Sequence, residues 1–195
     1  MEWIIVGVVA LLAIFLIITY NQLVKLANRY KNLFSQIDIQ LQRRYDLIPN
    51  LVESAKGYLQ HERETLEAVT SARNQAMGAL TMAKQNPGSP AVMAQLGEAE
   101  GMLGAALGRL NMVMEAYPDL KASQNMMQLS EELVNTENLV AFARQAYNDS
   151  VQMFNTKRQS FPAVMVAGMF GFADDAALLE MADRKVIQDA PRVSF

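Results

Sequence analysis

The feature that most constrains this chain is a long helical stripe with a proline inside it. Apolar residues recur every three or four positions, which is the spacing of one buried face of an α-helix. They are Leu23, Ala27, Tyr30, Phe34, Ile37, Leu41, Tyr45, Ile48, Val52, Ala55 and Leu59. Two adjoining steps of four shift the stripe just before Pro49. Because proline lacks an N–H donor and disfavours helix at the preceding residue, the chain either kinks or turns there.

The stripe comes directly after a stretch that is apolar enough to cross a membrane. Residues 3–19 carry no charge and no proline, and as a helix they would span roughly 25 Å. The preceding residues are not basic and no A-x-A site follows, so we expect an uncleaved anchor and not a signal peptide. Lys25, Arg29 and Lys31 on the far side favour a cytoplasmic location for the rest of the chain. The alternative is a buried core helix of a soluble protein.

The remaining periodicity is helical as well. The pattern continues past Leu59 to the loop QNPGSP at residues 85–90, where Ser89 and Pro90 fit a helix start. A glycine-rich helix over residues 91–116 and a turn at residues 116–122 come next. The last helix has an apolar seam at Met126, Leu133, Val140, Tyr147, Phe154 and Phe161. The sequence predicts an all-α fold with an anchor (1–20), a helical bundle (21–162), and an apolar segment with a tail (163–195).

After Pro162 the chain lacks helical periodicity. Residues 161–172, FPAVMVAGMFGF, are uncharged but too short to span a bilayer. They either dock on the bundle, lie in the membrane interface, or join subunits. Within the tail, DDAALLEMADRKV predicts a short helix, and we expect the tail to be partly mobile or ordered only by contact.

Composition argues against most chemistry. The chain has no cysteine and one histidine, His61, so a metal site would need carboxylates, and we expect no metal and no cofactor. A net charge of −3 argues against a nucleic-acid partner. We find no phosphate-binding loop and no nucleophile elbow, and we expect no catalytic residues and no enzyme activity. The 13 methionines are expected to fill the core.

Four ionic residues interrupt the apolar stripes: Glu62, Arg73, Glu137 and Arg144. Because a charge on a packed seam is costly unless paired, we expect at least one ion pair across helices between Glu62 or Arg73 and Glu137 or Arg144, which would fix helix register. The alternative is that these long side chains reach water at the edge of the stripe.

The motifs in this order resemble the LemA family of bacterial membrane-anchored proteins. The resemblance is carried by YNQLV (20–24), IDIQLQRRYDLIPNLVESAKGYLQHE (37–62), TSAR (70–73) and EAYPDLKA (115–122). It continues with LSEELVNTENLVAFARQAYNDSVQMFN (129–155), SFP (160–162), FGF (170–172) and the closing P-x-V-x-F (191–195). The methionine-rich, acidic tail departs from the usual pattern, so the function of the tail is the least transferable part.

The resemblance implies an N-terminal transmembrane helix with a short outside end, followed by an antiparallel four-helix bundle with long helices in the cytoplasm. Four helices suggest a turn at or near Pro49, which would bring residues 161–172 down to the membrane; a simple kink would leave them far from it. The family has no established catalytic activity, and a magnetosome-forming relative suggests a role in membrane organisation.

Our functional hypothesis is a non-enzymatic, self-associating scaffold that organises or remodels the bacterial inner membrane. The alternatives are an accessory subunit that presents the bundle to a membrane protease or signalling enzyme and, beyond that, a carboxylate hydrolase. The expected partners are membrane lipid, further copies of the chain, and a membrane protein. The expected interaction residues are Arg43, Arg44 and Asp46 beside Pro49, and Phe161, Met165, Phe170 and Phe172 after the last helix. Arg43 and Arg44 are alternatively structural, paired with Asp46 and Asp38 at the helix surface.

Overall fold

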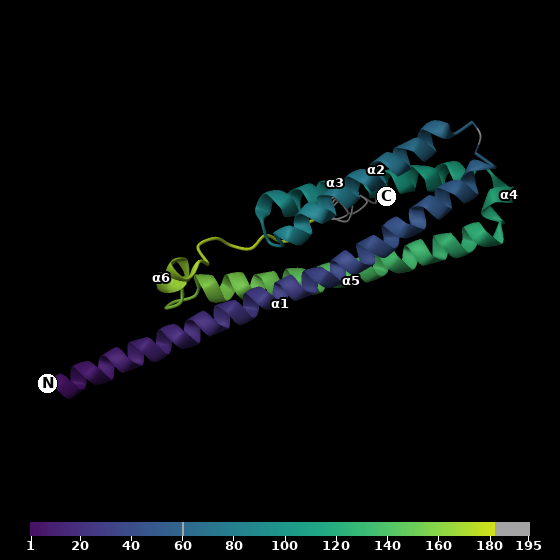
Figure 1. Ribbon diagram of the computed structural model, residues 1–195. Helices are drawn as coiled ribbons and strands as arrows, with labels where there is room; N and C mark the ends of the chain where they lie inside the picture. Colours follow the sequence, from purple (N-terminus) through teal and green to yellow (C-terminus); the bar gives the residue numbers. More distant parts are fainter. Residues whose placement is uncertain (60, 182–195) are drawn as a thin grey trace, which may run out of the picture.

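The structure is a computed structural model that describes residues 1–59 and 61–181, and within these residues it contains helices and no strand. The long helices are α1 (Glu2–Lys56), α2 (Arg63–Gln85), α3 (Pro90–Met114) and α5 (Gln124–Gln159). Short turns of helix occur at α4 (Pro118–Lys121), α6 (Val164–Ala167) and η1 (Gly168–Phe170). The predicted all-α fold is therefore confirmed (Figure 1).

Helix α1 continues without interruption through Pro49 and ends seven residues later, at Lys56. The chain then reverses between Gly57 and Glu62, so the expectation of unbroken helix beyond Leu59 is wrong. The predicted stripe on α1 is buried, from Leu23 at 0% exposed to Ile48 at 1%. Since the apolar face of α1 is covered from Leu23 to Ala55, packing outweighs the helix-breaking tendency of the proline.

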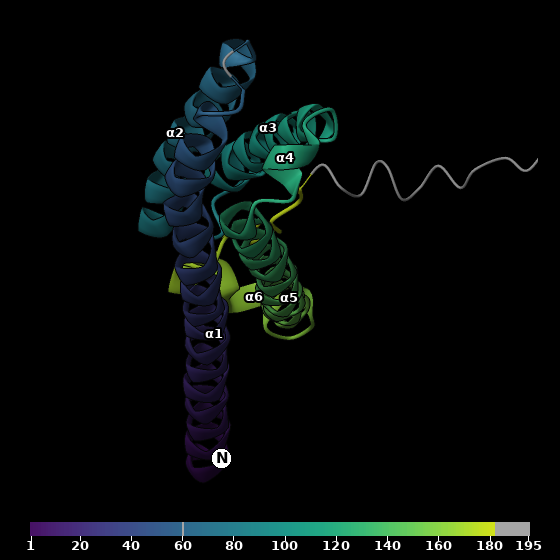
Figure 2. The same ribbon diagram turned by 90° about the vertical axis from the view of Figure 1, so that its right-hand side faces the viewer.

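The order of contacts shows how the chain returns. Tyr30 lies against Phe154 and Phe34 against Tyr147, with ring centroids 5.4 and 5.7 Å apart. Residue numbers therefore increase along α1 while those of the contacted residues in α5 decrease, so α5 runs back toward Tyr20 (Figures 1 and 2). Helices α2 and α3 lie side by side near the far half of α1. The loop between them contains Ser89 as N-cap and Pro90 in the first turn of α3, as predicted.

The first part of α1 has no covering element. Most large apolar residues from Trp3 to Ile18 are 38–88% exposed, and burial begins at Thr19, which is 2% exposed. The most apolar window of α1 has a mean hydropathy of 2.8 and is 6% buried. A soluble core helix would be mostly buried, so this alternative does not fit the structure. Both views show this part of α1 as an isolated helix (Figures 1 and 2).

The last helix ends earlier than its seam suggests. Met126, Val140, Tyr147 and Phe154 are buried, but the helix ends at Gln159 and Phe161 is 81% exposed. The tail also differs from the prediction, because residues 173–181, here called the tail strap, form no helix. The rest of the predicted tail helix and the P-x-V-x-F motif lie in residues 182–195, outside the described part of the chain.

Candidate functional site

A buried polar group connects α1 to α3. The Arg44 guanidinium lies 3.0 Å from the Glu100 carboxylate, and the two side chains are 9% and 1% exposed. The Tyr45 hydroxyl donates a hydrogen bond to the other oxygen of Glu100. Burial, with the nearby Glu100 charge, raises the pKa of Tyr45 well above its ordinary value. The group is thus an ionic contact inside the core, where losing one partner is costly.

A second polar contact explains how α1 tolerates its proline. Proline at position 49 cannot donate to the carbonyl of Tyr45, four residues earlier. The Arg73 side chain of α2 fills this role, since its Nε donates to the Tyr45 carbonyl oxygen at 2.6 Å. Its Nη1 also donates to the Asn74 side chain at 3.2 Å. Arg73 therefore satisfies the backbone group that Pro49 leaves without a helical donor.

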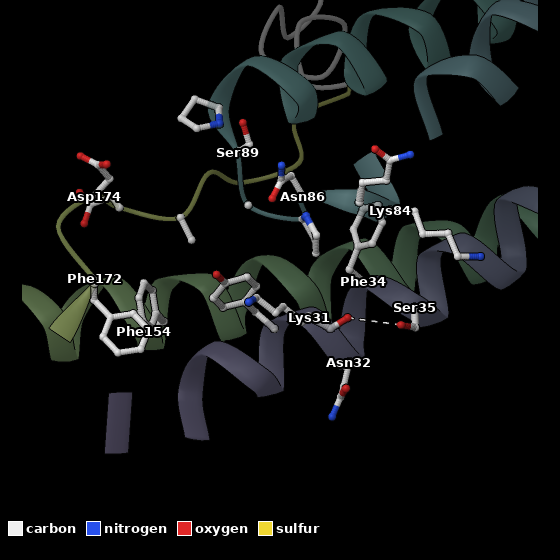
Figure 3. Close-up of a pocket in the computed structure, with 18 of the residues that line it drawn as sticks. Lys31, Asn32, Phe34, Ser35, Lys84, Asn86, Ser89, Phe154, Phe172 and Asp174 are labelled. Atoms are coloured by element: carbon white, nitrogen blue, oxygen red, sulfur yellow. Dashed lines mark hydrogen bonds between the residues drawn. The ribbon is translucent and has the colours of Figure 1, made fainter. Parts of the chain in front are cut away.

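A cleft of about 700 Å³ opens where α1, the α2–α3 loop and the tail strap meet (Figure 3). Its polar lining includes Lys31, Asn32, Ser35, Asn86, Ser89 and Asp174. The Ser35 hydroxyl donates to the Lys31 carbonyl at 3.4 Å. At one side Lys84 pairs with the buried Asp38, with 2.6 Å between Nζ and Oδ2. The lining offers amides, hydroxyls and charges of both signs, which suit a polar ligand. No group of three or more acidic or histidine side chains suited to a metal occurs in the described residues.

The tail strap is held to α5 by paired hydrogen bonds between asparagine side chains and the strap backbone. Asn155 donates to the Ala176 carbonyl and accepts from the Ala176 N–H, both at 2.9 Å. Asn148 makes the same pair of bonds with Leu179, at 3.1 and 2.9 Å. Two asparagines thus supply the donors and acceptors that a neighbouring strand would supply. This explains why the segment lies extended and not helical.

Further contacts hold both ends of the strap. Near its start, Arg158 donates to Asp175 and to the Ala173 carbonyl, and Gln159 also donates to Asp175. Partial burial alone would raise the pKa of the Asp175 carboxyl, but these hydrogen bonds and the Arg158 charge lower it. Near its end, the Glu180 carbonyl lies against Gly97 of α3, where a Cβ atom would collide with it. The glycine is needed for this close approach.

The apolar segment, residues 161–172, folds against the two long helices near Tyr20. The Phe170 ring packs on Tyr20 with centroids 5.3 Å apart, and Phe172 packs on Phe154 at 5.8 Å. Phe161 and Met165 are 81% and 71% exposed. Of the four interaction residues expected here, two thus pack on α1 and α5 and two face outward. The expectation that only a turn at or near Pro49 could bring this segment back toward the anchor is wrong, because the chain turns at residues 57–62 instead.

Of the three interaction residues expected beside Pro49, two are exposed and one is buried. Arg43 and Asp46 are exposed on α1, whereas Arg44 is 7% exposed and pairs with Glu100. Asp38 pairs with Lys84, so the partners of Arg44 and Asp38 differ from those expected in the structural alternative. An interaction role for Arg43 and Asp46 stays a prediction.

Of the four ionic residues expected on the apolar stripes, Arg73 donates a hydrogen bond to the backbone of α1. Glu137 and Arg144 of α5 line a cavity of about 220 Å³ together with Arg44 and Glu100. Glu62 is the N-cap residue of α2. The expected ion pair between the two sets stays a prediction.

Comparison with known proteins decides the family. The LemA family model matches residues 33–195. The chain belongs to the LemA family. This LemA chain is 29% identical over 141 residues to "Protein LemA" of Metamycoplasma hominis, covering 72% of the chain and 60% of that protein. Together with the exposed apolar part of α1, family membership supports membrane association.

Two further relatives are named for magnetosomes. The chain is 25% identical over 183 residues to "Magnetosome protein MamQ 2" of Paramagnetospirillum magneticum, covering 86% of the chain and 67% of the relative. It is 28% identical over 173 residues to "Magnetosome protein MamQ" of Magnetospirillum gryphiswaldense, covering 80% and 63%. The matched region thus spans about three fifths to two thirds of the length of these LemA-family relatives.

Sequence reasoning on this LemA chain missed three important residues. Glu100 lies in a glycine-rich helix, and its place as a charge among small residues is the local hint of its burial. Asn148 and Asn155 lie seven residues apart in α5 and so face the same side of the helix. That spacing of asparagines beside an apolar seam was the available signal for the strap.

Proposed function

We propose that this LemA-family chain is a membrane-anchored, self-associating scaffold that organises the bacterial inner membrane without catalysing a reaction. The observation that carries the proposal is the continuity of α1, whose first part is exposed and apolar and whose second part is the core of the bundle. The proposed anchor and the packed domain therefore share one continuous helix. Similarity to proteins named for magnetosomes also supports a role in organising a membrane.

The topology proposed for this scaffold is a single pass with the N-terminus outside and the helices in the cytoplasm. Exposed Lys25, Arg29 and Lys31 come after the apolar part of α1, whereas Glu2 precedes it, and basic residues favour the cytoplasmic side. Trp3 and Tyr20 lie near the two ends of that part, which suits the two interfaces of a bilayer. The domain itself is proposed to be an antiparallel four-helix bundle of α1, α2, α3 and α5.

Self-association is supported by apolar side chains exposed among polar ones on the outer face of α5, here called the α5 stripe. Val134 and Phe142 are 59% and 75% exposed, and Met127 and Met153 are about half exposed. On a helix with about 3.6 residues per turn, these positions lie on the side opposite the buried Val140, Tyr147 and Val151. A second copy of the chain is the occupant that we propose for this stripe, because one stripe can pair with its symmetry mate.

The first test is the particle mass of the full-length protein in mild detergent, beside a version that starts at Tyr20. A scaffold should give a large, uniform assembly when full length. Phe142→Lys should shrink that assembly, whereas Asn125→Lys, an exposed change about 100° around α5 from Phe142, should leave it intact. A monomer or dimer in every sample would contradict self-association as the main activity.

The accessory-subunit alternative is favoured by one observation, the open cleft beside the α2–α3 loop, whose mixed polar lining suits a protein loop. An accessory subunit should be small when purified alone and should co-purify from native membranes with one partner in fixed stoichiometry. Recovery of large particles containing this chain alone would instead favour the scaffold.

A further inference from the structure

The exposed side of the apolar segment has a defined position along α1. Because Phe170 packs on Tyr20, the segment sits where the isolated part of α1 ends and the covered part begins. Helix α6 contacts both α1 and α5 there. Figures 1 and 2 show α1 alone continuing beyond α6 toward the N-terminus.

That isolated part matches the thickness of a bilayer core. Residues 2–19 form about 27 Å of helix, close to the roughly 30 Å of hydrocarbon in a membrane. If they span the bilayer, Tyr20 lies at the interface, where tyrosine is favoured. The apolar segment, which touches Tyr20, then lies at the same depth.

The segment has two different sides. Ala163 and Ala167 face the protein and are 2% and 1% exposed. Phe161, Met165 and Met169 are spaced four residues apart and are 81%, 71% and 83% exposed. Residues 161–172 carry no charge, so this exposed side would present only apolar side chains to water. An apolar surface that a soluble monomer would not leave in water points to an apolar environment.

We propose that residues 161–172 form a second membrane contact, which inserts Phe161, Met165 and Met169 into the interfacial layer of the bilayer that α1 spans. The occupant of this surface is the lipid itself, because the surface is continuous with the membrane-crossing part of α1. Lys25 and Arg29, exposed within about three turns of Tyr20, provide positive charge for anionic headgroups on the same side.

Depth-dependent fluorescence quenching tests this contact in the full-length chain. Trp3 is the only tryptophan, so Trp3→Phe gives a dark background. Single reporters are then added as Met165→Trp in the segment, Phe142→Trp on the outer face of α5, and Leu11→Trp inside the anchor. Each protein is reconstituted in phosphatidylcholine–phosphatidylglycerol vesicles that carry bromine at shallow or deep acyl positions. Thermal unfolding in detergent checks that each variant folds like the parent.

The proposal expects Met165→Trp to lose emission most with shallow bromines and to show a blue-shifted spectrum. Leu11→Trp should be quenched most by deep bromines, and Phe142→Trp by neither. Met165→Trp without quenching would overturn the membrane contact, and a blue shift without quenching would place a protein partner there instead. Absence of quenching at Leu11→Trp would overturn the spanning anchor, and the second contact with it.

Discussion

Arg73 and Pro49 should be energetically coupled although they lie on different helices. In the native chain, Arg73→Met removes the donor to the Tyr45 carbonyl, and Tyr45 is 1% exposed. Leaving a buried acceptor unsatisfied costs about 1–3 kcal/mol. For a chain of this size that corresponds to a fall in Tm of roughly 2–12 °C.

Arg73→Met should lower the free energy of unfolding much less when residue 49 has a backbone N–H that can donate a hydrogen bond. In a Pro49→Ala background the new backbone N–H can bond to the Tyr45 carbonyl within the helix. Arg73→Met should then cost less than about 0.5 kcal/mol, as for a surface change. The double-mutant cycle should therefore give a coupling of about 0.5–3 kcal/mol, which is the first cost less the second.

Thermal unfolding of the full-length chain in detergent, followed by circular dichroism at 222 nm, measures all four proteins of the cycle. Arg63→Met is the matched control, because Arg63 also lies on α2 and its ion pair with Glu67 is exposed. This change should alter stability by less than about 1 kcal/mol in either background. Equal costs of Arg73→Met with proline and with alanine at position 49 would refute the reasoning.

Three further predictions use other contacts. Arg44→Met should cost about 3–5 kcal/mol in the same melts because it leaves Glu100 buried without this partner, whereas the neighbouring exposed Arg43→Met should be nearly neutral; equal effects would contradict the buried pair. Gly97→Ala should displace the tail strap and speed amide hydrogen exchange at Leu179, while Gly104→Ala, with open space around it, should stabilise α3 by about 0.5–1 kcal/mol. The pKa of Asp175 in the folded chain lies below its ordinary value, so its carboxylate contributes to folding stability above about pH 4, and this contribution is lost as the pH falls through the folded pKa. A carbon-13 titration of the carboxyl group should show this low pKa, and Arg158→Met should raise it.

How far the sequence predicts this fold depends on whether the signal is periodic. The stripe of α1 and the seam of α5 repeat at helical spacing, and Ile37, Leu41, Tyr147 and Phe154 are buried as that spacing requires. The QNPGSP loop was equally clear, since proline and glycine act locally. These features need no knowledge of the partner helix.

The outcome at Pro49 could not be predicted locally. Proline weakens a helix by removing one backbone hydrogen bond. Whether the helix survives depends on which other donor reaches the carbonyl left without that bond, and on how much apolar surface the helix buries. Here the replacement comes from Arg73, 28 residues after Tyr45, whose carbonyl it binds. No local pattern contains that information.

The tail strap shows the same limit. Local propensity favoured a helix in DDAALLEMADRKV, but side-chain amides of α5 satisfy the strap backbone in an extended form. Tertiary hydrogen bonds thus replace those of a helix. The candidate surfaces were predicted by composition alone, so sequence reasoning located residues 161–172 but not which of their side chains face outward.

The length of α1 gives the molecule a mechanical property. From Tyr20 to Lys56 the helix extends about 54 Å, so under the proposed topology a contact made at the far end would be held at about that distance from the membrane. Transmembrane helices tilt when the bilayer becomes thinner. Because the proposed anchor and the packed part of the chain share α1, a tilt of about 10° would move the far end sideways by about 9 Å. A small change in bilayer thickness would therefore be amplified at the distal tip, as by a lever pivoted at the membrane surface.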